Sequence, residues 1–496
     1  MVNRTQMAPA AYFEQTPFSH TPAIHMIWLA RPTFFTAALI LALSMVASAT
    51  RVSAQEDVSA QEDVSAQPPE TDQQTADPAA DSKATVPPAI AIPADTQPTD
   101  QPTVGDTPPA DLKDSAELQK EFVQTPEYLA ELENRVTAYN QSRANLATAV
   151  ADQRETFVRY LNREVRTKAA RTRFFEQRDI VQQRLDENFE AALSLTMIGQ
   201  FDEDAITFLV TMIQHRFDNS IYDRPTLDGA TLLIDNNSQL EYIWKAAARS
   251  AVVQGEFKIA KTIYDILQKP EILGDEEFDK TDAALSFFMD EHEKHYKLEK
   301  EIREKEAAED NLPRVLLKTT KGDVVLELFL NEAPSAVSHF IKLVDEKFYD
   351  GMDFPLVIQD KLALTGDPSG NGLGHSGKFL KDEHEREDAR HSLRGSLLMA
   401  KIPVDDTGKF FPNSGSSQFT ILFLPMVSAT KEQTVFGRVI EGMDAISRLR
   451  RIDPNKKKEK DEIVQPPDSI IKATVIRKPE TLPEPVYVDP ANRDVQ

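Results

Sequence analysis

The spacing of apolar residues changes at Arg314, and this change constrains the fold more than any other feature of the sequence. Before it, apolar side chains recur at steps of three and four residues, as at Leu132 and Val136, which is the period of an amphipathic helix. After it, Val315 and Leu317 alternate with polar neighbours, which is the period of a strand. The sequence therefore predicts a helical region followed by a domain built mainly of strands.

The length and composition of the chain narrow the class of protein. A chain of 496 residues is too long for one ordinary domain, and 41% hydrophobic residues are enough for sizeable cores. The formal net charge of −24 argues against nucleic-acid binding, which needs a basic face for phosphates. The absence of cysteine excludes disulfides, thiolate nucleophiles and cysteine metal sites.

An uncharged, mostly apolar run follows Arg31 and covers residues 32–50. It ends in small-x-small sites, Ala47-Ser-Ala49 and Val52-Ser-Ala54, which are typical of signal cleavage. We expect residues 1–54 to be a signal peptide, with Met26 as an alternative start, and the mature protein to be periplasmic or secreted. The alternative is an uncleaved anchor in the inner membrane, because about 18 apolar residues approach the length of a membrane span.

Residues 55–115 form an acidic segment rich in proline, alanine and threonine, without an aromatic residue. The hexad Ser-Ala-Gln-Glu-Asp-Val occurs there in tandem, from Ser53 and from Ser59. Such a composition buries too little apolar surface to offset the entropy of ordering, so we expect a disordered linker. We expect the tail, residues 480–496, to be disordered as well.

The region from 116 to 309 is expected to be helical, with two segments that share a local pattern. In each, an alanine-rich helix precedes a Gly-x-Phe sequence, at Gly199 and at Gly255, and a second helix follows. These segments resemble tetratricopeptide-type hairpins, although the glycines are 56 residues apart and the repeat has about 34. The alternative is an irregular helical bundle. Either form predicts a surface for a protein partner.

Two charged segments are interpreted as solvated surfaces. His292 and His295 are three residues apart, whereas a two-histidine zinc motif needs a spacing of four, so we predict a solvated helix that continues to Glu309 as a connector. The basic patch formed by Arg448–Arg451 with Lys456–Lys458 is expected to face solvent, or to meet the acidic linker or an anionic partner.

The sequence between residues 313 and 479 predicts many short strands and two helices. Lys321-Gly322 is a tight turn between the first two strands, and Pro334 fits the first turn of a helix. The second helix is expected at Met443–Arg450. This pattern favours a closed antiparallel barrel. Its further strands are expected at Phe354–Ile358, Leu397–Ala400, Gln418–Leu422, Thr434–Val439 and Ile470–Ile476.

A series of short motifs in this domain resembles the cyclophilin-type peptidyl-prolyl isomerases. In chain order they are Phe348-Tyr-Asp-Gly351, Gly366-Asp367, Met399-Ala400, Ser417-Gln418-Phe419 and Val435-Phe436-Gly437. The resemblance covers roughly a third of the chain. It implies an eight-stranded barrel with a peptide groove on its outer face.

The resemblance also implies where the catalytic groups of the groove would stand. Prolyl isomerisation must cross a barrier of about 18–20 kcal/mol that amide resonance sets. In the family an arginine two residues after a phenylalanine donates a hydrogen bond to the proline nitrogen. Aligned on Phe354, that arginine position falls on Leu356, which has no donor. Losing such a transition-state contact typically lowers the rate about 10²–10³-fold.

The other catalytic positions of the family also hold different residues here. The phenylalanine–methionine pair falls on Lys361 and Leu362, and the groove glutamine falls on Leu364. The aromatic residue of the proline pocket, the tryptophan and the histidine fall on Thr420, Ser428 and Gln433. No catalytic residue of the family is therefore intact in this sequence.

Ala400 and Gln418 match the family, and the resemblance assigns peptide binding to them together with Leu362 and Thr420. We therefore expect an exported cyclophilin-like protein that binds proline-containing or extended polypeptides, with weak or absent isomerase activity. The alternatives are an active isomerase that assists protein folding and a structural scaffold of the envelope. We expect no metal, no cofactor and no nucleic-acid partner, and membrane contact only through residues 32–50.

Overall fold

The computed structural model describes residues 125–161, 167–273, 277–404, 409–453 and 466–489. The predicted signal or anchor and the predicted acidic linker lie outside the described residues. None of the described helices is both long enough and apolar enough to cross a membrane.

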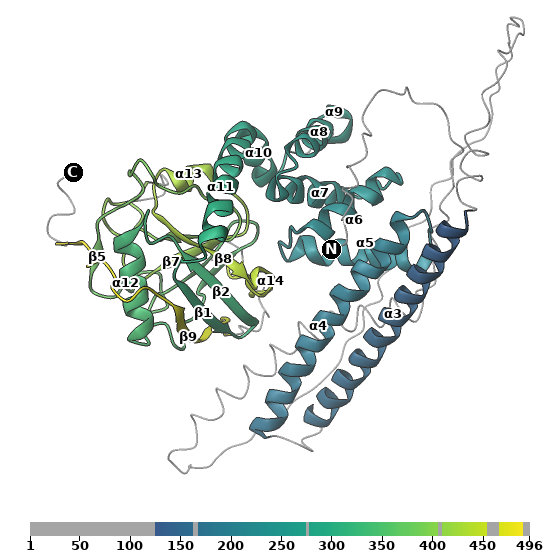
Figure 1. Cartoon of the computed structure of the whole chain (residues 1–496), viewed down its shortest axis with the longest axis horizontal. Coiled ribbons are helices and arrows are strands. Elements are labelled where there is room, and N and C mark those ends of the chain that lie inside the picture. Colours follow the sequence, from purple (N-terminus) through teal and green to yellow (C-terminus); the bar gives the residue numbers. More distant parts are fainter. Residues whose placement is uncertain (1–124, 162–166, 274–276, 405–408, 454–465, 490–496) are drawn as a thin grey trace, which may run out of the picture.

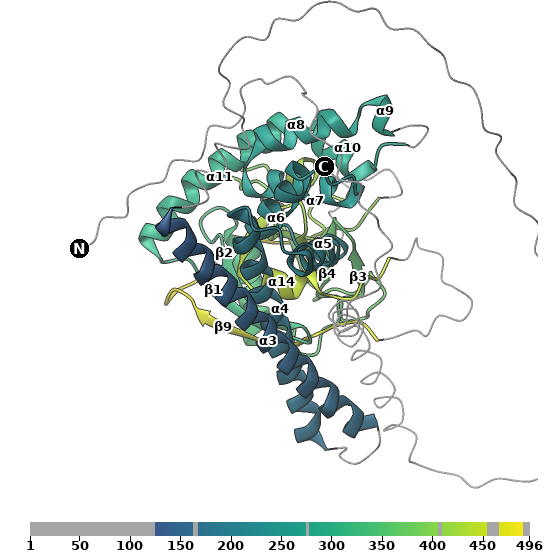
Figure 2. The ribbon, with the colours of Figure 1, turned by 90° about the vertical axis from the view of Figure 1, so that its right-hand side faces the viewer.

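The described helices α3 to α11 precede the first strand and form the helical region. Its first two helices, α3 and α4, form a long antiparallel hairpin whose far end extends beyond the other described elements (Figures 1 and 2). The side chains of Asp202 and Asp223 cap α5 and α6 by accepting hydrogen bonds from the backbone of the first turn. The helices are α3 Pro126–Leu161, α4 Lys168–Met197, α5 Glu203–Asp218, α6 Arg224–Asp235, α7 Glu241–Gln254, α8 Phe257–Leu267, α9 Pro270–Leu273, α10 Lys280–Phe287 and α11 Met289–Glu309.

The two Gly-x-Phe sequences each lie between two helices. Gly199 follows α4 and Gly255 follows α7, with φ angles of +85° and +78°. At Gly255 a side chain is also excluded by space, because an added Cβ would lie 2.3 Å from the Tyr296 ring. The helices flanking Gly199 have 30 and 16 residues and those flanking Gly255 have 14 and 11, so the two units are not equal in length.

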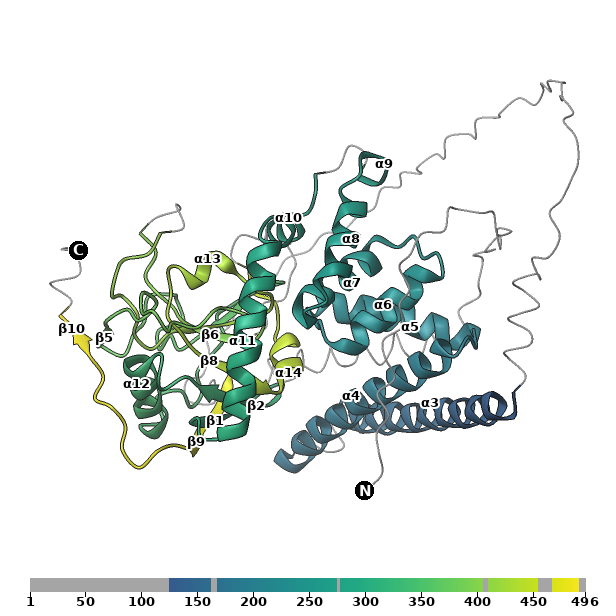
Figure 3. The same cartoon turned by 45° about the horizontal axis from the view of Figure 1, so that its top comes forward.

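The C-terminal region forms one curled antiparallel sheet of eight strands in the order β3-β4-β7-β6-β8-β2-β1-β9 (Figures 1 and 3). The two edges approach each other just before β3 and β9, where Phe354 N donates to Asp468 O and Ile470 N donates to Met352 O, both at 2.8 Å. The predicted fold class, a helical region followed by a cyclophilin-like barrel, is confirmed. The strands are β1 Arg314–Thr319, β2 Gly322–Leu328, β3 Leu356–Ile358, β4 Leu362–Thr365, β6 Ser396–Met399, β7 Phe419–Leu422, β8 Val435–Glu441 and β9 Ile470–Arg477.

The inner face of the curled sheet holds an aromatic core. The Phe340 ring, on helix α12 (Pro334–Asp345), lies 5.3 Å from the Phe419 ring and 5.4 Å from the Phe436 ring, centroid to centroid. Tyr349 joins this cluster, and its hydroxyl donates to Ser417 O. Two shorter helices complete the domain, α13 Val427–Thr430 and α14 Met443–Ser447.

The structure differs from the expected tail of the chain. We expected residues 480–496 to be disordered, but Tyr487–Val488 forms strand β10 and pairs with β5 (Phe379–Leu380). The Tyr487 hydroxyl also lies 3.1 Å from His339 Nδ1. The pairing with β5 and the contact with this buried histidine hold Tyr487 and Val488 against the barrel.

The predicted solvated connector is wrong, because α11 packs against the barrel (Figures 1 and 3). His292 is buried, His295 stacks on His391 with ring centroids 3.8 Å apart, and Glu299 is only 1% exposed. Glu299 accepts hydrogen bonds from Arg390, which lies in the loop before β6.

The basic segment 448–451 is likewise not simply a solvated surface. The Arg451 guanidinium lies over the Phe423 ring, with its central carbon 4.9 Å from the ring centroid, and it donates to Ser220 Oγ. In both places the tertiary contact supplies a partner that the local sequence does not reveal.

Candidate functional site

The pairing register places three of the predicted groove residues side by side. Leu356 on β3 pairs with Leu364 on β4, Leu364 pairs with Thr420 on β7, and Thr420 pairs with Leu398 on β6. Directly paired residues of an antiparallel ladder have Cβ atoms about 4.5–5.5 Å apart. Four neighbouring strands therefore present one continuous row of side chains, and we call these four residues the outer row.

The outer row lies on the face opposite to the core. Val357, Ala363 and Ile421 alternate with the row along their strands, and all three belong to the buried core of the barrel. Leu356 and Leu364 are half-buried, and Thr420 is buried. The row is an apolar strip with one hydroxyl.

Leu362 lies at one end of this face, where a small apolar cluster covers it. On the same face, Ile358 pairs with Leu362, and Leu362 pairs with Leu422. The remaining predicted positions surround this end: Lys361 and Ser428, the latter on α13, are exposed, and Gln433 is half-buried. The cluster around Leu362 contains Leu312, Phe329, Leu398, Leu422, Met426, Ala429 and Val435.

The other end of the face continues into a small cavity. Ala400 lies two residues after Leu398, and Gln418 lies two residues before Thr420, so both are on the side of the outer row. They line a cavity of about 70 Å³, which Leu373, Phe379 and Ile402 also line. The predicted peptide-binding residues thus lie along one face, with Ala400 and Gln418 at the cavity end and Leu362 at the opposite end.

A loop that the sequence analysis did not single out forms one wall of this cavity. Gln418 Nε2 donates to Gly372 O at 3.1 Å and to Gly374 O at 2.7 Å. Burial would raise the pKa of Asp367, but hydrogen bonds from the backbone of Ser369 and Gly372 outweigh burial and lower it. A Cβ at Gly374 would lie 2.0 Å from an Asp367 oxygen, so the wall needs glycine there. The signal was the close spacing of glycines after Asp367.

A buried histidine supports the same wall from behind. His339 Nε2 lies 3.2 Å from Ser376 Oγ, which lies 3.0 Å from Ser416 Oγ, and Ser416 lines the cavity. Burial, with Lys342 and Lys378 nearby, lowers the pKa of His339 to about 4. The imidazole is therefore neutral near pH 7 and acts as a fixed hydrogen-bonding group.

The face has little of the chemistry that prolyl isomerisation requires. The side chains of the outer row are three leucines and one threonine, and Lys361 is the charged residue next to Leu362. Among the described residues, no cluster of three or more histidine, aspartate or glutamate side chains is arranged to hold a metal ion. What the face offers a ligand is apolar contact and a small cavity.

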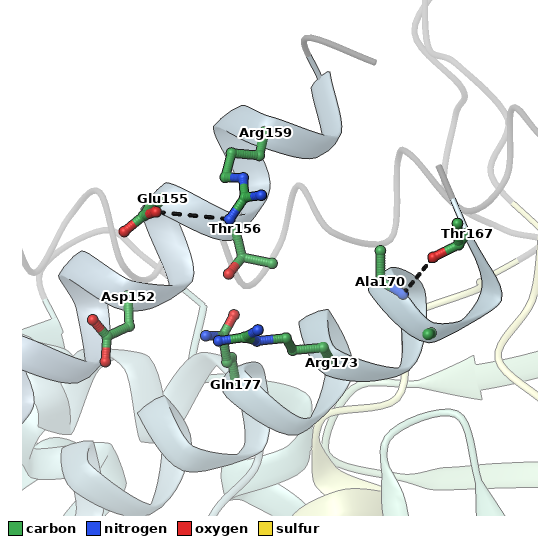
Figure 4. A pocket seen from close by; sticks show the side chains of 9 residues that line it. Asp152, Glu155, Thr156, Arg159, Thr167, Ala170, Arg173 and Gln177 are labelled. Carbon is green, nitrogen blue, oxygen red and sulfur yellow. Dashed lines mark hydrogen bonds and ion pairs between the residues drawn. The ribbon is translucent and has the colours of Figure 1, made fainter. Parts of the chain in front are cut away.

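A larger cavity, of about 390 Å³, lies between α3 and α4 (Figure 4). Arg159 and Arg173 line it together with Asp152 and Glu155, and Arg159 lies 3.9 Å from Glu155. Its charges are mixed, and the predicted groove residues do not line it. A third cavity lies between α4 and the barrel, and Asp186, Lys321 and Asp444 are among the residues that line it.

Comparisons with known proteins match the barrel. The family described as "Cyclophilin type peptidyl-prolyl cis-trans isomerase/CLD" matches residues 314–475. The chain is 39% identical over 163 residues to "Peptidyl-prolyl cis-trans isomerase cypE" of Dictyostelium discoideum, which covers 32% of this chain and 96% of the relative. It is 36% identical over 155 residues to a "Peptidyl-prolyl cis-trans isomerase" of Helicobacter pylori, covering 31% of this chain and 88% of the relative.

Solved structures of the same kind also match. A crystal structure of a cyclophilin-type peptidyl-prolyl cis-trans isomerase from Cryptosporidium parvum has 26% sequence identity and a TM-score of 0.28, and the match covers 34% of this chain and 99% of that one. The sequence motifs, the curled sheet and the relatives agree on the C-terminal region. Through residues 314–475, the chain belongs to the cyclophilin-type peptidyl-prolyl cis-trans isomerase family.

Proposed function

We propose that the outer face of the barrel binds extended or proline-containing polypeptide segments, and that its isomerase activity is weak or absent. The observation that carries this proposal is the outer row, in which Leu356 and Leu364 stand at the family's arginine and glutamine positions and pair directly with each other. An apolar pair of this kind holds a peptide by contact and donates no hydrogen bond to a twisting amide.

The chemistry of the reaction explains why binding and catalysis separate here. A cyclophilin lowers the amide barrier by holding proline in an apolar pocket while a donor stabilises the pyramidal nitrogen. Leu356 lacks the donor, and Thr420 and Ser428 replace the aromatic residues that would hold the proline ring. Loss of the donor alone typically lowers the rate about 10²–10³-fold. Loss of positioning lowers it further.

The groups that remain favour particular ligands. The two half-buried leucines of the outer row, Leu356 and Leu364, suit apolar side chains of an extended segment, and the exposed Lys361 suits a carboxylate beside them. The cavity beside Ala400 is large enough for a small side chain. We therefore infer a preference for apolar or acidic extended segments.

The second candidate is an active isomerase that assists protein folding. It is favoured by the names of the relatives, one of which is 39% identical to this chain. A third candidate, a structural scaffold, is favoured by the buried contacts between the barrel and α11.

We also propose that the protein is exported, on the basis of the apolar run 32–50 and its small-x-small sites. N-terminal sequencing of the native protein tests this. A mature terminus near Thr50 or Gln55 supports cleavage, and a membrane-bound chain with the run intact supports the anchor. A soluble cytoplasmic chain with residues 26–54 intact overturns both.

The activity is tested on the full chain, because the helices pack against the barrel. In a protease-coupled assay with a proline-containing peptide, we expect kcat/KM to be at least about two orders of magnitude below that of a catalytic cyclophilin assayed in parallel. Fluorescence anisotropy with the same labelled peptide should nevertheless show saturable binding. A rate within about tenfold of the catalytic protein would overturn the proposal.

A further inference from the structure

The turn between β3 and β4 is held by side chains from the helical region. Asp360, at the tip of this turn, is 8% exposed and has a φ of +59°. Its Oδ2 accepts from Arg249 Nη1 at 2.7 Å. Its Oδ1 accepts from the Tyr222 hydroxyl at 2.5 Å and from Ser220 Oγ at 2.8 Å. Three side chains from one region therefore fix one carboxylate of the other.

The arginine in this contact is itself held rigidly. Arg249, on α7, donates from Nε and Nη2 to the two carboxylate oxygens of Asp282, both at 2.8 Å. Asp279 accepts a further bond at 3.1 Å, and the guanidinium lies over the Phe217 ring. Bidentate pairing and stacking thus fix the orientation of the guanidinium through contacts that do not involve the β3–β4 turn.

The segment after β7 lies on the other side of the Leu362 end, where contacts within the barrel position Phe423. Phe423 O accepts from Arg394 Nη1 at 2.7 Å, and Phe423 N donates to Lys361 O at 2.9 Å. The next residue, Leu424, is buried in the core of the helical region rather than in that of the barrel. Both segments that border Leu362 thus contact the helical region, the β3–β4 turn through Asp360 and the segment after β7 through Leu424.

The two strands at this end of the face, β3 and β4, are short. β3 has three residues and pairs in the regular ladder with β4, while on its other side Val357 exchanges two backbone hydrogen bonds with Ile452. Its partner β4 has four residues. Short strands at the edge of a sheet are among its least stable parts, so contacts from outside the ladder help to fix where their side chains lie.

We propose that Asp360 and Arg249 are positioning residues for the groove. The helical region fixes the β3–β4 turn through this ion pair, and it thereby sets the position of Leu356 and Leu362 on the outer face. Both regions then determine the ligand-binding face: the barrel supplies its side chains, and the helical region sets their position. The part of this inference that concerns ligand affinity rests on the peptide binding proposed above, whereas the part that concerns the turn does not.

The experiment uses the full chain and the variant Asp360→Asn, which keeps the shape of the side chain and leaves Arg249 paired with Asp282 and Asp279. The matched control is Glu299→Gln. Glu299 is also a buried carboxylate in an arginine pair that joins helix and barrel, with Arg390, but it lies outside the β3–β4 turn. The first readout is amide hydrogen exchange of residues 356–364 without any peptide.

We expect exchange in residues 356–364 to rise about tenfold in Asp360→Asn and to remain unchanged in Glu299→Gln. Unchanged exchange in Asp360→Asn, or an equal rise in both variants, overturns the proposal. If Asp360→Asn fails to fold, Tyr222→Phe replaces it, because it removes the hydroxyl that bonds to Asp360 and Arg249 and keeps the ring. A rise confined to residues 356–364 in Tyr222→Phe supports the proposal, and its absence overturns it.

The second readout is the affinity for a fluorescein-labelled Ala-Ala-Pro-Phe peptide. We expect Asp360→Asn to weaken binding about tenfold and Glu299→Gln to leave it unchanged. Absence of binding by the unaltered protein would refute the proposed function, while the exchange experiment would still decide the role of the turn. Binding by Asp360→Asn as tight as that of the unaltered protein would overturn the positioning role.

Discussion

Arg390 offers the sharpest test of how the helices and the barrel are joined. The residue is 2% exposed, its Nε and Nη2 donate to Glu299, and its Nη1 lies 2.6 Å from a Glu306 oxygen. Its guanidinium lies over the Phe329 ring at 3.8 Å. Both partners of the ion pair are thus removed from water, so removing one of them leaves a buried charge.

We predict that Arg390→Met lowers the free energy of unfolding by about 4 kcal/mol, because breaking a buried pair from one side costs about 3–5 kcal/mol. The methionine keeps part of the contact with Phe329, but Glu299 then retains only the backbone of His391 as a partner. In the double variant Glu299→Leu/Arg390→Met neither of these two charges remains, and Glu306 keeps Arg438 as its partner. Replacing a buried pair by apolar residues is often close to neutral, so we expect the double variant to return to within about 1 kcal/mol of the unaltered protein.

Urea unfolding of the full chain, followed by circular dichroism and by tryptophan fluorescence, measures these changes. With an m value of about 3 kcal/mol per M, a loss of about 4 kcal/mol lowers the urea midpoint by about 1.3 M. A change below about 1 kcal/mol in Arg390→Met, or a double variant as unstable as the single one, would refute the reasoning. The first outcome would mean that the pair is solvated, and the second that the loss comes from packing.

Three further predictions concern the activity of the groove, the stability of the protein at low pH and the turn at Gly255. Leu356→Arg alone should not restore isomerisation in the protease-coupled assay, whereas measurable turnover should return when it is combined with Leu364→Gln, Thr420→Phe and Ser428→Trp. Burial lowers the pKa of His292 to about 4, so between about pH 6.5 and 4 the unfolded chain binds more protons than the folded chain. The free energy of unfolding should therefore decrease as the pH is lowered from 6.5 to 4. Gly255→Ala should lower the thermal midpoint more than Gly351→Ala does, because both glycines have a positive φ but only Gly255 faces the Tyr296 ring.

Each of these predictions has an outcome that contradicts it. Full activity from the single arginine would mean that one contact, and not the whole groove, had been lost. For the acid prediction, His292→Met should flatten the decline of the urea midpoint between pH 6.5 and 4, and an unchanged slope would show that His292 is not buried in solution. Equal losses in the two glycine variants would show that backbone strain alone, of about 1 kcal/mol, accounts for the effect.

The sequence alone determined the fold class and named three of the four residues of the outer row. The change of period at Arg314 separated helices from strands, because each kind of element imposes its own spacing on the residues that face a core. The intervals between Phe354, Gly366 and Gln418 were sufficient to align Leu356, Leu364 and Thr420 with the family's groove. Strand pairing then brought those three together, as a ladder must when its register is set by the same buried residues.

The tertiary structure alone decided which charged residues are buried. Glu299 stands in a highly charged stretch and Asp360 between Gln359 and Lys361, and their partners Arg390 and Arg249 are 91 and 111 residues away along the chain. Periodicity reports the environment of apolar side chains, since these must face a core. A carboxylate is stable either in water or beside a buried guanidinium, so the residues around it in the sequence do not show which environment it has. Only the packing of the helices against the barrel decides this.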